Sequence, residues 1–244
     1  MKYLIFSDVH GNLEALTVVL EQIDFYHPDK VICLGDIVGY GPNPNECVSQ
    51  VHDRANITIM GNHDHAVLGL TDISYFNQYA KLAVLWTRQV LKEDNYTLLR
   101  NAPLSVTDGA ILFVHSTPLH PERWDYIFNP LEGQYYLQHL DAQTCFIGHS
   151  HQPLFFKKDI DEQIIFDRKF SFSVPIEEGC RYIINVGSVG QPRDGNPDAS
   201  FALYDTDTQT VQIKRLPYDI ELTQKKMQDI GLPPFLIDRL AYGR

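Results

Sequence analysis

The chain has 244 residues, of which 44% are hydrophobic and 21% charged, a balance that suits one globular domain and excludes collagen, coiled coil and disorder. Its 31 acidic and 20 basic residues give a formal net charge of −11, which argues against binding to duplex nucleic acid or acidic membrane surfaces. The four cysteines form no C-x-x-C pair, and no apolar run has the length of a membrane span. We therefore expect a cytoplasmic protein with reduced thiols and no membrane partner.

The first hundred residues alternate short apolar runs with segments of helical periodicity, which is typical of a layered β-α-β protein. Asn12 precedes one such segment and is expected to cap it. Asn43, Pro44 and Glu46 offer the next helix a cap, a first-turn proline and an acidic residue. The expected strands are 3–6, 31–34 and 56–60, and the expected helices are 13–23, 44–53 and 77–91.

The chain from Leu104 onward is dominated by expected strands. Asp108-Gly109 between two apolar runs predicts a β-hairpin. The tail 222–240 has helical character, interrupted at a glycine and two prolines. No repeat or linker divides the sequence, so we expect a single domain, 1–244, built as a β-sandwich flanked by helices. The further expected strands are 145–147, 154–156, 164–166, 182–185, 201–204 and 211–214.

Polar residues follow five of the expected strands, directly at their carboxyl ends. In open α/β sheets these ends form the ligand crevice, so the side chains are expected to converge. Taken singly, most of these motifs are more common as turns or helix caps, whereas the His-x-His of GHSH is rarely a packing feature. Their occurrence in order at five strand ends indicates a functional site. The residues are Asp8, His10, Asp36, Asn62, His63, His115, His149 and His151.

The chemistry of this set favours divalent cations. Imidazoles, carboxylates and one amide, without a thiolate, suit borderline or hard ions such as Mn²⁺, Fe²⁺ or Zn²⁺. The set offers more candidate ligands than one ion that keeps an open position can use, so two ions are the better expectation. A carboxylate such as Asp36 can bridge two ions about 3.5 to 4 Å apart, a separation used for in-line displacement at phosphorus.

The series DVHG, GDIVGYG, GNHD, a later histidine and GHSH resembles the calcineurin-like metallophosphoesterase superfamily. The stretch INVGSVGQPRDGNPDASF also resembles the carboxyl-terminal signature of small prokaryotic members, close to the YfcE-like branch. This resemblance implies a four-layer α/β/β/α sandwich with a di-metal centre at one edge of the sheets. It also implies hydrolysis of a P–O bond in a phosphodiester or phosphomonoester by a metal-bridging hydroxide.

The resemblance further assigns roles to residues of this sequence. His63 would be the catalytic histidine that aids the leaving oxygen, with the adjacent Asp64 as an orienting carboxylate or, if it points away, a turn residue. The cofactors would be two ions of Mn, Fe, Zn or Ni, with Mn favoured. One ion would be held by Asp8, His10, Asp36 and His151, and the other by Asp36, Asn62, His115 and His149.

One motif departs from a related branch. Protein serine/threonine phosphatases carry GDxVDRG, where this chain has GDIVGYG with Gly39 and Tyr40. An aspartate that steadies the catalytic histidine and an arginine that grips phosphate are therefore missing, which argues against protein phosphatase activity of that type. Arg193, in the loop GSVGQPRDG, is our candidate for a cation that contacts substrate, although the loop can also be an ordinary turn.

Several alternatives stay open at this stage. The substrate is expected to be a small phosphoester or a nucleotide, and a dinucleoside polyphosphate or nucleotide phosphohydrolase is the alternative within the same chemistry. An alternative of another class is a non-catalytic interaction module on the same fold, against which the complete ligand set argues. The aromatic segment 66–103 is either an ordinary amphipathic helix or an element that covers substrate or forms a homo-oligomer.

Overall fold

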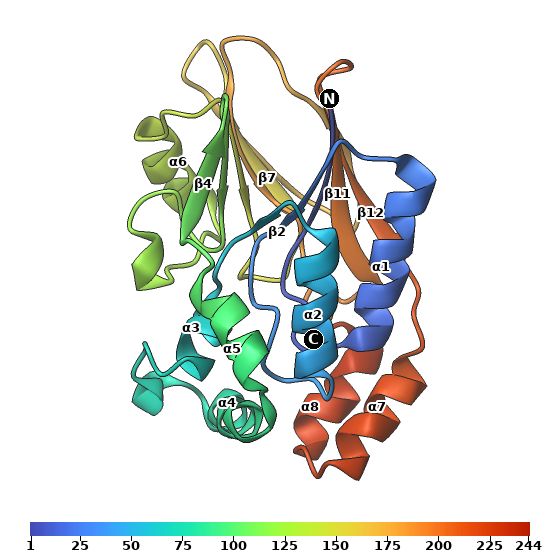
Figure 1. Cartoon of the computed structure of the whole chain (residues 1–244). Helices are drawn as coiled ribbons and strands as arrows, with labels where there is room; N and C mark the ends of the chain where they lie inside the picture. The colour runs from blue at the N-terminus through green and yellow to red at the C-terminus, as the bar shows by residue number, and fades with distance from the viewer.

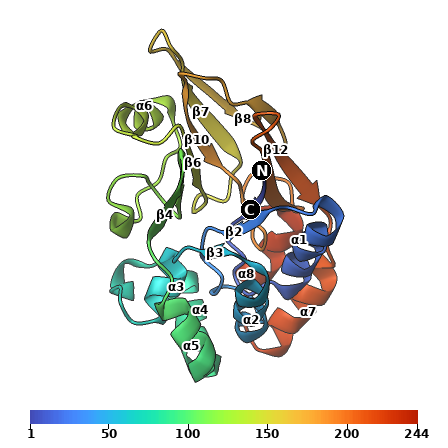
Figure 2. The same ribbon diagram turned by 45° about the horizontal axis from the view of Figure 1, so that its top comes forward.

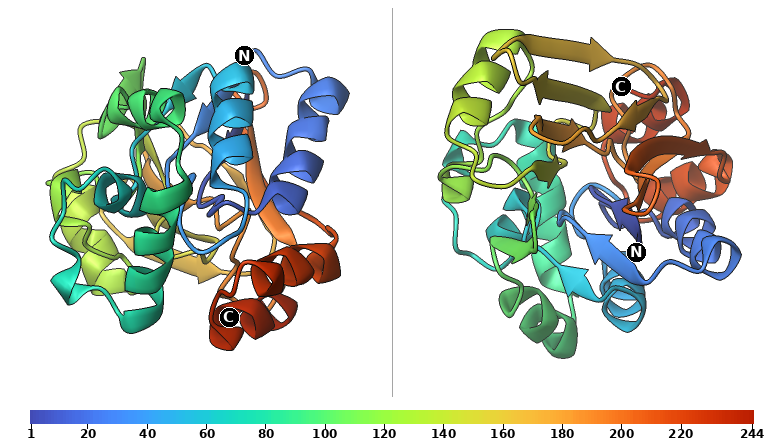
Figure 3. Two further views of the ribbon diagram at one scale, coloured as in Figure 1. Left: turned by 60° about the horizontal axis from the view of Figure 1, so that its bottom comes forward. Right: turned by 90° about the horizontal axis from the view of Figure 1, so that it is seen from above.

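The computed structural model describes residues 1–244 as two six-stranded sheets that face each other, with helices on both outer faces (Figure 1). The expected four-layer α/β/β/α sandwich is confirmed. The first sheet joins the amino-terminal strands to strands from the end of the chain, as Figure 3 shows from above. Its order is β3 (Ile57–Thr58), β2 (Lys30–Cys33), β1 (Lys2–Phe6), β11 (Ala199–Asp205), β12 (Thr210–Leu216) and β9 (Ser173–Pro175).

The second sheet begins with the expected hairpin, in which Gly109 adopts a left-handed backbone conformation at the turn. β5, β6 and β10 run parallel to one another, as do β1, β2 and β3 in the first sheet. In each sheet the carboxyl ends of the parallel strands therefore lie next to one another on the same side. The order is β4 (Ser105–Asp108), β5 (Ile111–Val114), β6 (Thr144–Ile147), β10 (Arg181–Asn185), β7 (Leu154–Lys158) and β8 (Ile164–Arg168).

Helices lie on the outside of both sheets and below their carboxyl ends (Figure 2). None combines the length and the apolar character needed to cross a lipid bilayer. The α-helices are α1 (Leu13–Tyr26), α2 (Pro44–Arg54), α3 (Asn62–Val67), α4 (Gln78–Val90), α5 (Glu93–Arg100), α6 (Pro130–Gln138), α7 (Ile220–Asp229) and α8 (Pro234–Asp238). Three short 3₁₀ helices are η1 (Ile73–Tyr75), η2 (Pro121–Arg123) and η3 (Arg239–Tyr242).

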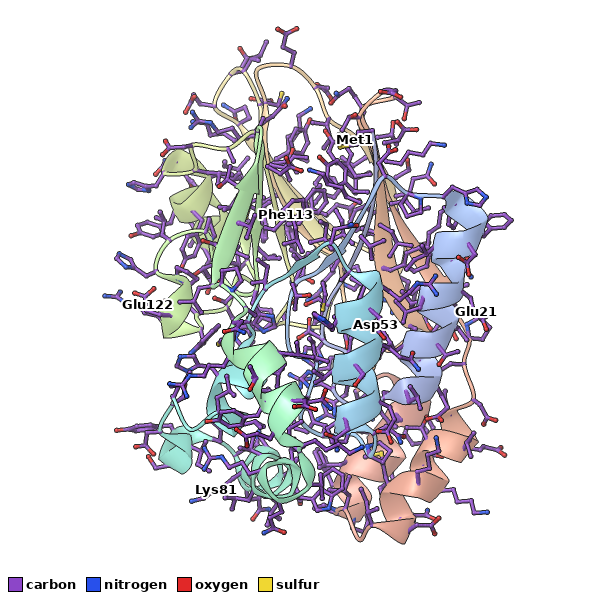
Figure 4. All side chains as sticks on the ribbon, in the orientation of Figure 1. Met1, Glu21, Asp53, Lys81, Phe113 and Glu122 are labelled. Carbon is purple, nitrogen blue, oxygen red and sulfur yellow. The ribbon has the colours of Figure 1, made fainter.

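Alternation along each strand builds the core. In β1, Leu4 and Phe6 pack toward α1 and α2, whereas Ile5 packs between the sheets. In β6, Phe146 likewise lies in the inter-sheet cluster beside Phe113, which is labelled in Figure 4. Because side chains of a strand point alternately to its two faces, each central strand contributes to two apolar layers at once. These layers hold the strand ends, and the loops that follow them, in fixed positions.

Local sequence signals account for most helix and strand boundaries. One expected cap is wrong, and one helix is not predicted. Asn12 caps α1 as expected, because its side chain accepts a hydrogen bond from the backbone of Ala15. The expected cap by Asn43 is wrong: its side chain makes no capping bond and instead accepts from Lys226 Nζ at 3.4 Å. No helix is predicted at α6, although Asn129, Pro130 and Glu132 give its start a cap, a first-turn proline and a capping box. A Cβ at Gly133 would lie 2.3 Å from the Phe156 ring, so the glycine permits close packing on β7.

Candidate metal centre

The loops after the parallel strands bring the polar residues to one buried point. Asp8, Asp36 and His149 follow β1, β2 and β6, and each has a positive φ. This left-handed conformation is uncommon for side-chain-bearing residues, and aspartate and histidine tolerate it better than most. It turns the chain sharply at the end of a strand, so that the side chain projects into the space shared by the two sheets. Sharp turns of this kind cluster at functional sites.

Two groups of side chains within this space have the geometry of metal ligands. In the first group, one ligand atom from each residue lies within 4.8 Å of all the others, and the same limit holds in the second. All of these residues are buried, and Asp36 belongs to both groups. Asn62 Oδ1 lies 3.3 Å from His115 Nε2, beside the second group. The first group is Asp8, His10, Asp36 and His151, and the second is Asp36, His115 and His149.

Backbone carbonyls fix the orientation of the four imidazoles. Each ring places one nitrogen on a carbonyl oxygen, which favours a proton there, so that in the neutral ring the other nitrogen carries no hydrogen and can bind a metal. In His10, His115 and His151 this other nitrogen is Nε2, which lies 3.7, 3.4 and 3.2 Å from a carboxylate oxygen of the centre. The contacts are His10 Nδ1 with Val38 O at 3.1 Å, His115 Nδ1 with Leu34 O at 2.9 Å, His149 Nε2 with Trp124 O at 2.8 Å and His151 Nδ1 with Gln191 O at 2.5 Å.

The charges in the centre also fit divalent cations. Asp8 Oδ1 is fully buried and has no hydrogen-bond partner, a costly arrangement that a cation would relieve. Burial opposes ionisation of Asp8, but His151 and His115 outweigh it and hold the pKa of this carboxyl well below its usual value. Burial would likewise lower the pKa of His115, yet Asp36 and Asp8 raise it to about 9. Burial also opposes ionisation of Asp36, but His115 outweighs it and holds the pKa of Asp36 well below its usual value, so both carboxylates are ionised at neutral pH.

His63 lies at the edge of the centre. Its backbone N–H donates to Asp36 Oδ1 at 2.7 Å, which ties the start of α3 to the carboxylate shared by both groups. Its ring packs 4.9 Å from the His10 ring and 4.5 Å from the Tyr40 ring, and its buried Nδ1 has no hydrogen-bond partner. Burial lowers the pKa of His63 to about 4, so the imidazole is neutral at pH 7. A neutral imidazole can donate or accept one hydrogen bond at each nitrogen.

Asp64 does not contact the ring of His63. Its Oδ1 accepts from the backbone N–H groups of Ile37 and Val38 at 2.9 and 3.1 Å, and its Oδ2 accepts from Gly61 N at 3.0 Å. The carboxylate therefore caps the start of α3 by accepting from the N–H of Gly61, and it holds the GDIVG loop against that helix. The orienting contact expected for Asp64 is absent, because the backbone donors of two loops occupy both of its oxygens.

Comparison with known proteins identifies the family. The profile described as the calcineurin-like phosphoesterase superfamily domain matches residues 1–209. The chain belongs to this superfamily. It is 39% identical over 244 residues to an uncharacterized protein of Methanocaldococcus jannaschii, covering 98% of this chain and 97% of that one. The crystal structure of a metallophosphoesterase from Sphaerobacter thermophilus is 41% identical, with a TM-score of 0.88 over 100% of this chain and 99% of that one.

A more distant relative matches less than half of the chain. The symmetrical bis(5′-nucleosyl)-tetraphosphatase of Aliivibrio salmonicida is 35% identical over 105 residues, which is 41% of this chain and 38% of that one. Members of the calcineurin-like superfamily are generally phosphoesterase hydrolases that use divalent metal ions. The superfamily expected from the motifs is confirmed, and the His/Asp cluster of this chain is a metal-binding candidate.

Gly39 explains how this superfamily member accommodates its histidine. Gly39 has φ +92°, and a Cβ there would lie 2.6 Å from His63 Nδ1. The imidazole therefore fills the space that a side chain at position 39 would need. Tyr40, the next residue, supplies an aromatic contact to both His10 and His63. The sequence GDIVGYG thus replaces a carboxylate beside the histidine with aromatic packing.

Arg193 lies on the other side of Tyr40. Its guanidinium carbon is 5.7 Å from the Tyr40 ring centroid, and its backbone N–H donates to His151 O at 3.2 Å. Its Nε and Nη2 donate to Gln191 Oε1 at 3.2 and 2.7 Å, a neutral partner that leaves the positive charge uncompensated. This cation therefore stands beside the metal-binding candidate.

Three contributors to the site were not expected from the sequence. Trp124 and Gln191 orient histidines through their backbone carbonyls, and no side-chain pattern signals such a role. Arg239 lies in η3, beyond the matched region, and burial together with the charge of Arg193 lowers the pKa of Arg239 to about 10. The segment 66–103 forms α4 and α5, and its Phe76 packs 5.5 Å from the His63 ring.

Proposed function

We propose that this protein is a divalent-metal-dependent phosphoesterase that binds two ions side by side. The observation that carries this proposal is the pair of buried ligand groups that share Asp36. We assign the first ion to Asp8, His10, Asp36 and His151, and the second to Asp36, Asn62, His115 and His149. A shared carboxylate is the arrangement that holds two ions close enough to act on one phosphoryl group. We regard residues 1–244 as one metallophosphoesterase domain.

The donor set suits manganese, iron, zinc or nickel, and we favour manganese because oxygen ligands accompany the imidazoles. Two bound divalent ions would attract an anionic phosphoester and lower the pKa of water toward neutrality, which supplies the nucleophile. The ionised carboxylates of Asp8 and Asp36 leave a net positive charge in such a centre. The chain's overall charge of −11 does not cancel it, because exposed charges are screened beyond about 8 Å at physiological salt.

His63 is the candidate that assists the leaving oxygen. It is neutral at pH 7 because burial lowers its pKa, so it acts best as a hydrogen-bond donor to the oxygen on which negative charge develops. Nearby cations oppose its protonation further. The contacts of its ring with Tyr40, His10 and Phe76 restrict its orientation without a carboxylate partner. Asp64 acts indirectly, through the start of α3 that carries His63.

The substrate is a small phosphoester or a nucleotide, bound with help from Arg193. The partial match to a bis(5′-nucleosyl)-tetraphosphatase supports a nucleotide phosphohydrolase as the second candidate. A non-catalytic interaction module is disfavoured, because such a protein has no need for a complete set of buried ligands with oriented imidazoles. We place the protein in the cytoplasm, where its four free, buried cysteines would stay reduced. A homo-oligomer is compatible with this proposal.

The decisive experiment combines hydrolysis with metal analysis. Wild-type protein, stripped with chelator and reloaded in turn with Mn²⁺, Ni²⁺, Zn²⁺, Fe²⁺ or Mg²⁺, is assayed on bis(p-nitrophenyl) phosphate and p-nitrophenyl phosphate. Asp36→Asn and His63→Ala are expected to lower kcat by about 10³-fold or more, as loss of a principal catalytic group does. Elemental analysis is expected to find two ions per chain in the wild type and in His63→Ala, and fewer in Asp36→Asn.

His52→Ala is the matched control for His63→Ala. His52 lies exposed on α2, away from the centre, and its loss should leave both the rate and the metal content unchanged. Wild-type rates in the Asp36→Asn and His63→Ala variants, with the folded circular dichroism spectrum retained, would refute the proposed centre.

A further inference from the structure

A cavity of about 510 Å³ opens next to the candidate metal centre, on the side of Arg193. Its volume falls in the range of sites for drug-sized ligands. Gln152, one of its walls, directly follows His151, and Arg193, another wall, donates its backbone N–H to His151 O. The cavity and the candidate centre therefore share a boundary. Its lining is Gln152, Arg168, Lys169, Phe170, Arg193 and Asp194.

The lining is strongly cationic, although the chain as a whole is acidic. It contains three basic side chains and one carboxylate, and that carboxylate is already neutralised. Asp194 forms an ion pair with Arg215, and both side chains are almost completely buried, at 6% and 7% exposure. Arg193 donates only to a neutral amide oxygen, and Arg168 Nη1 likewise donates to the neutral Gln152 Oε1 at 3.2 Å. Positive charge in the cavity is thus left without an acidic partner except at Lys169, which pairs with Asp167.

Arg215 joins the two walls of the cavity. Its guanidinium donates to Asp194 on one wall and through Nε to Phe170 O, at 2.8 Å, on the other. Through Nη1 it also donates to Asp198 O at 2.9 Å. Because all three bonds come from one rigid, planar group, the loop after β8 and the loop that carries Arg193 are held at a fixed separation. The cavity is therefore formed before any ligand enters.

Phe170 supplies a flat apolar surface in this cationic setting. Its side chain is 53% exposed, while its backbone carbonyl is anchored by Arg215. An exposed phenyl ring that lies beside arginine and lysine side chains has the chemistry that binds a nucleotide: the cations meet phosphate oxygens and the ring stacks on the base. A simple aryl or alkyl ester would use neither feature.

We propose that this cavity binds the leaving group of the substrate, and that this leaving group is a nucleotide that carries at least one further phosphate. In this arrangement Arg168 and Lys169 bind the non-reacting phosphate oxygens, Phe170 stacks on the base, and Arg193 spans the cavity and the reacting phosphorus. The inference rests on the proposed phosphoesterase function and names the substrate class that its site selects.

The test compares two substrates in one enzyme. Manganese-loaded wild type, the double variant Arg168→Gln/Lys169→Gln and the control Lys2→Gln are assayed on diadenosine tetraphosphate and on bis(p-nitrophenyl) phosphate. In the double variant the ratio of kcat/KM for the nucleotide to kcat/KM for the aryl diester is expected to fall about tenfold or more, the loss expected for two charged hydrogen bonds. Lys2 begins β1 at the end opposite Asp8, and its variant should keep the wild-type ratio.

A binding measurement separates this inference from the catalytic proposal. Calorimetry on chelated protein measures the Kd of adenosine 5′-diphosphate and of pyrophosphate. The double variant should weaken both by about tenfold, whereas Phe170→Ala should weaken the nucleotide by about fivefold or more and leave pyrophosphate unchanged, since only a base stacks. An unchanged substrate ratio, a wild type that cleaves the aryl diester but not the nucleotide, or equal nucleotide affinity in all variants would overturn the inference. If the wild type cleaves neither ester, the proposed phosphoesterase function fails, and the binding data alone test whether the cavity binds a nucleotide.

Discussion

The central strands and the loops that follow their carboxyl ends differ in chemistry and in backbone geometry. Between the sheets, Ile5, Phe113 and Phe146 form an apolar layer with ordinary strand geometry. A few residues further along the chain, Asp8 and Asp36 have left-handed backbones, buried charge and, at Asp8, an unpartnered oxygen. The apolar layer stabilises the fold. The strand ends reduce that stability, because strained backbone and buried charge hold the ligands in fixed positions. The two regions should therefore respond differently to mutation, metal and pH.

The largest effect is expected in the apolar layer. Phe146 is fully buried and packs against Phe113 and Tyr204, so Phe146→Ala should lower the free energy of unfolding by about 3 to 5 kcal/mol. Denaturant unfolding of metal-free protein measures this change. Below the midpoint of the variant, kcat per folded molecule should match the wild type. A large loss of kcat in the folded variant would break the comparison, because it would mean that the layer also tunes the site.

Metal binding should stabilise the strand ends by a smaller amount. At a free Mn²⁺ concentration of about 10 times Kd, linkage predicts a gain of about 1.4 kcal/mol per site, or about 2.8 kcal/mol for two sites, in the free energy of unfolding. Thermal unfolding with and without Mn²⁺ measures the gain. His149→Ala removes a ligand candidate and should reduce it, whereas Phe146→Ala should retain all of it. Equal metal stabilisation in wild type and His149→Ala would contradict the assignment of His149.

The pH dependence of stability should also originate at the strand ends. Burial lowers the pKa of His63 to about 4, below the ordinary 6.5. Above pH 6.5 the histidine is neutral in both states and contributes nothing; below it, the unfolded chain takes up a proton that the folded site excludes. The free energy of unfolding of metal-free wild type should therefore fall, relative to His63→Gln, by about 2 kcal/mol between pH 7 and pH 5.

Chemical denaturation of both proteins at pH 7, 6 and 5 gives this difference directly. The difference between the two proteins cancels the contributions of the other buried groups, which both proteins share. One of these groups is Asp64: burial and Asp36 raise its pKa to about 7, so its contribution to stability changes with pH in the opposite direction. A difference that does not vary with pH would show that His63 is solvated in the metal-free protein.

The smallest effect distinguishes two asparagines that precede helices. Asn12 caps α1 and also donates to Gly190 O at 2.9 Å, so Asn12→Ala should cost about 1 to 2 kcal/mol. Asn43 caps nothing, and Asn43→Ala should cost less than about 0.5 kcal/mol. Urea midpoints of the two variants check this contrast. Equal costs would mean that the capping bond contributes little at this position.

The sequence was informative where a local pattern has one physical meaning. Polar residues directly after apolar runs located the strand ends, and the resemblance supplied the grouping around Asp36 that the structure makes spatially reasonable. The expected strand 56–60 shortens to β3, because pairing with β2 extends only through Thr58. Asp64 could not be assigned from sequence, since its partners are backbone N–H groups of a loop 26 and 27 residues away along the chain.

Local sequence patterns could not predict which segments far apart in the chain pair with each other. The pairing of β1 with β11 joins segments almost two hundred residues apart, and nothing local in either strand specifies it. The cavity beside Arg193 is likewise the product of a loop after β8 and a loop before β11 that Arg215 brings together. The helix α6, by contrast, has a local signal, because Asn129, Pro130 and Glu132 mark its start; only the glycine that packs on Phe156 weakens its helical pattern.

The left-handed residues of the centre limit how this protein can evolve. Asp8, His10, Asp36, His149 and His151 all have positive φ, so most replacements there must bear a backbone penalty in addition to any chemical loss. Changes of substrate preference are therefore expected elsewhere, in the exposed segment 168–170 that lines the cavity. Directed libraries that seek new substrates would succeed most readily there, with the turns at the ends of the parallel strands left untouched.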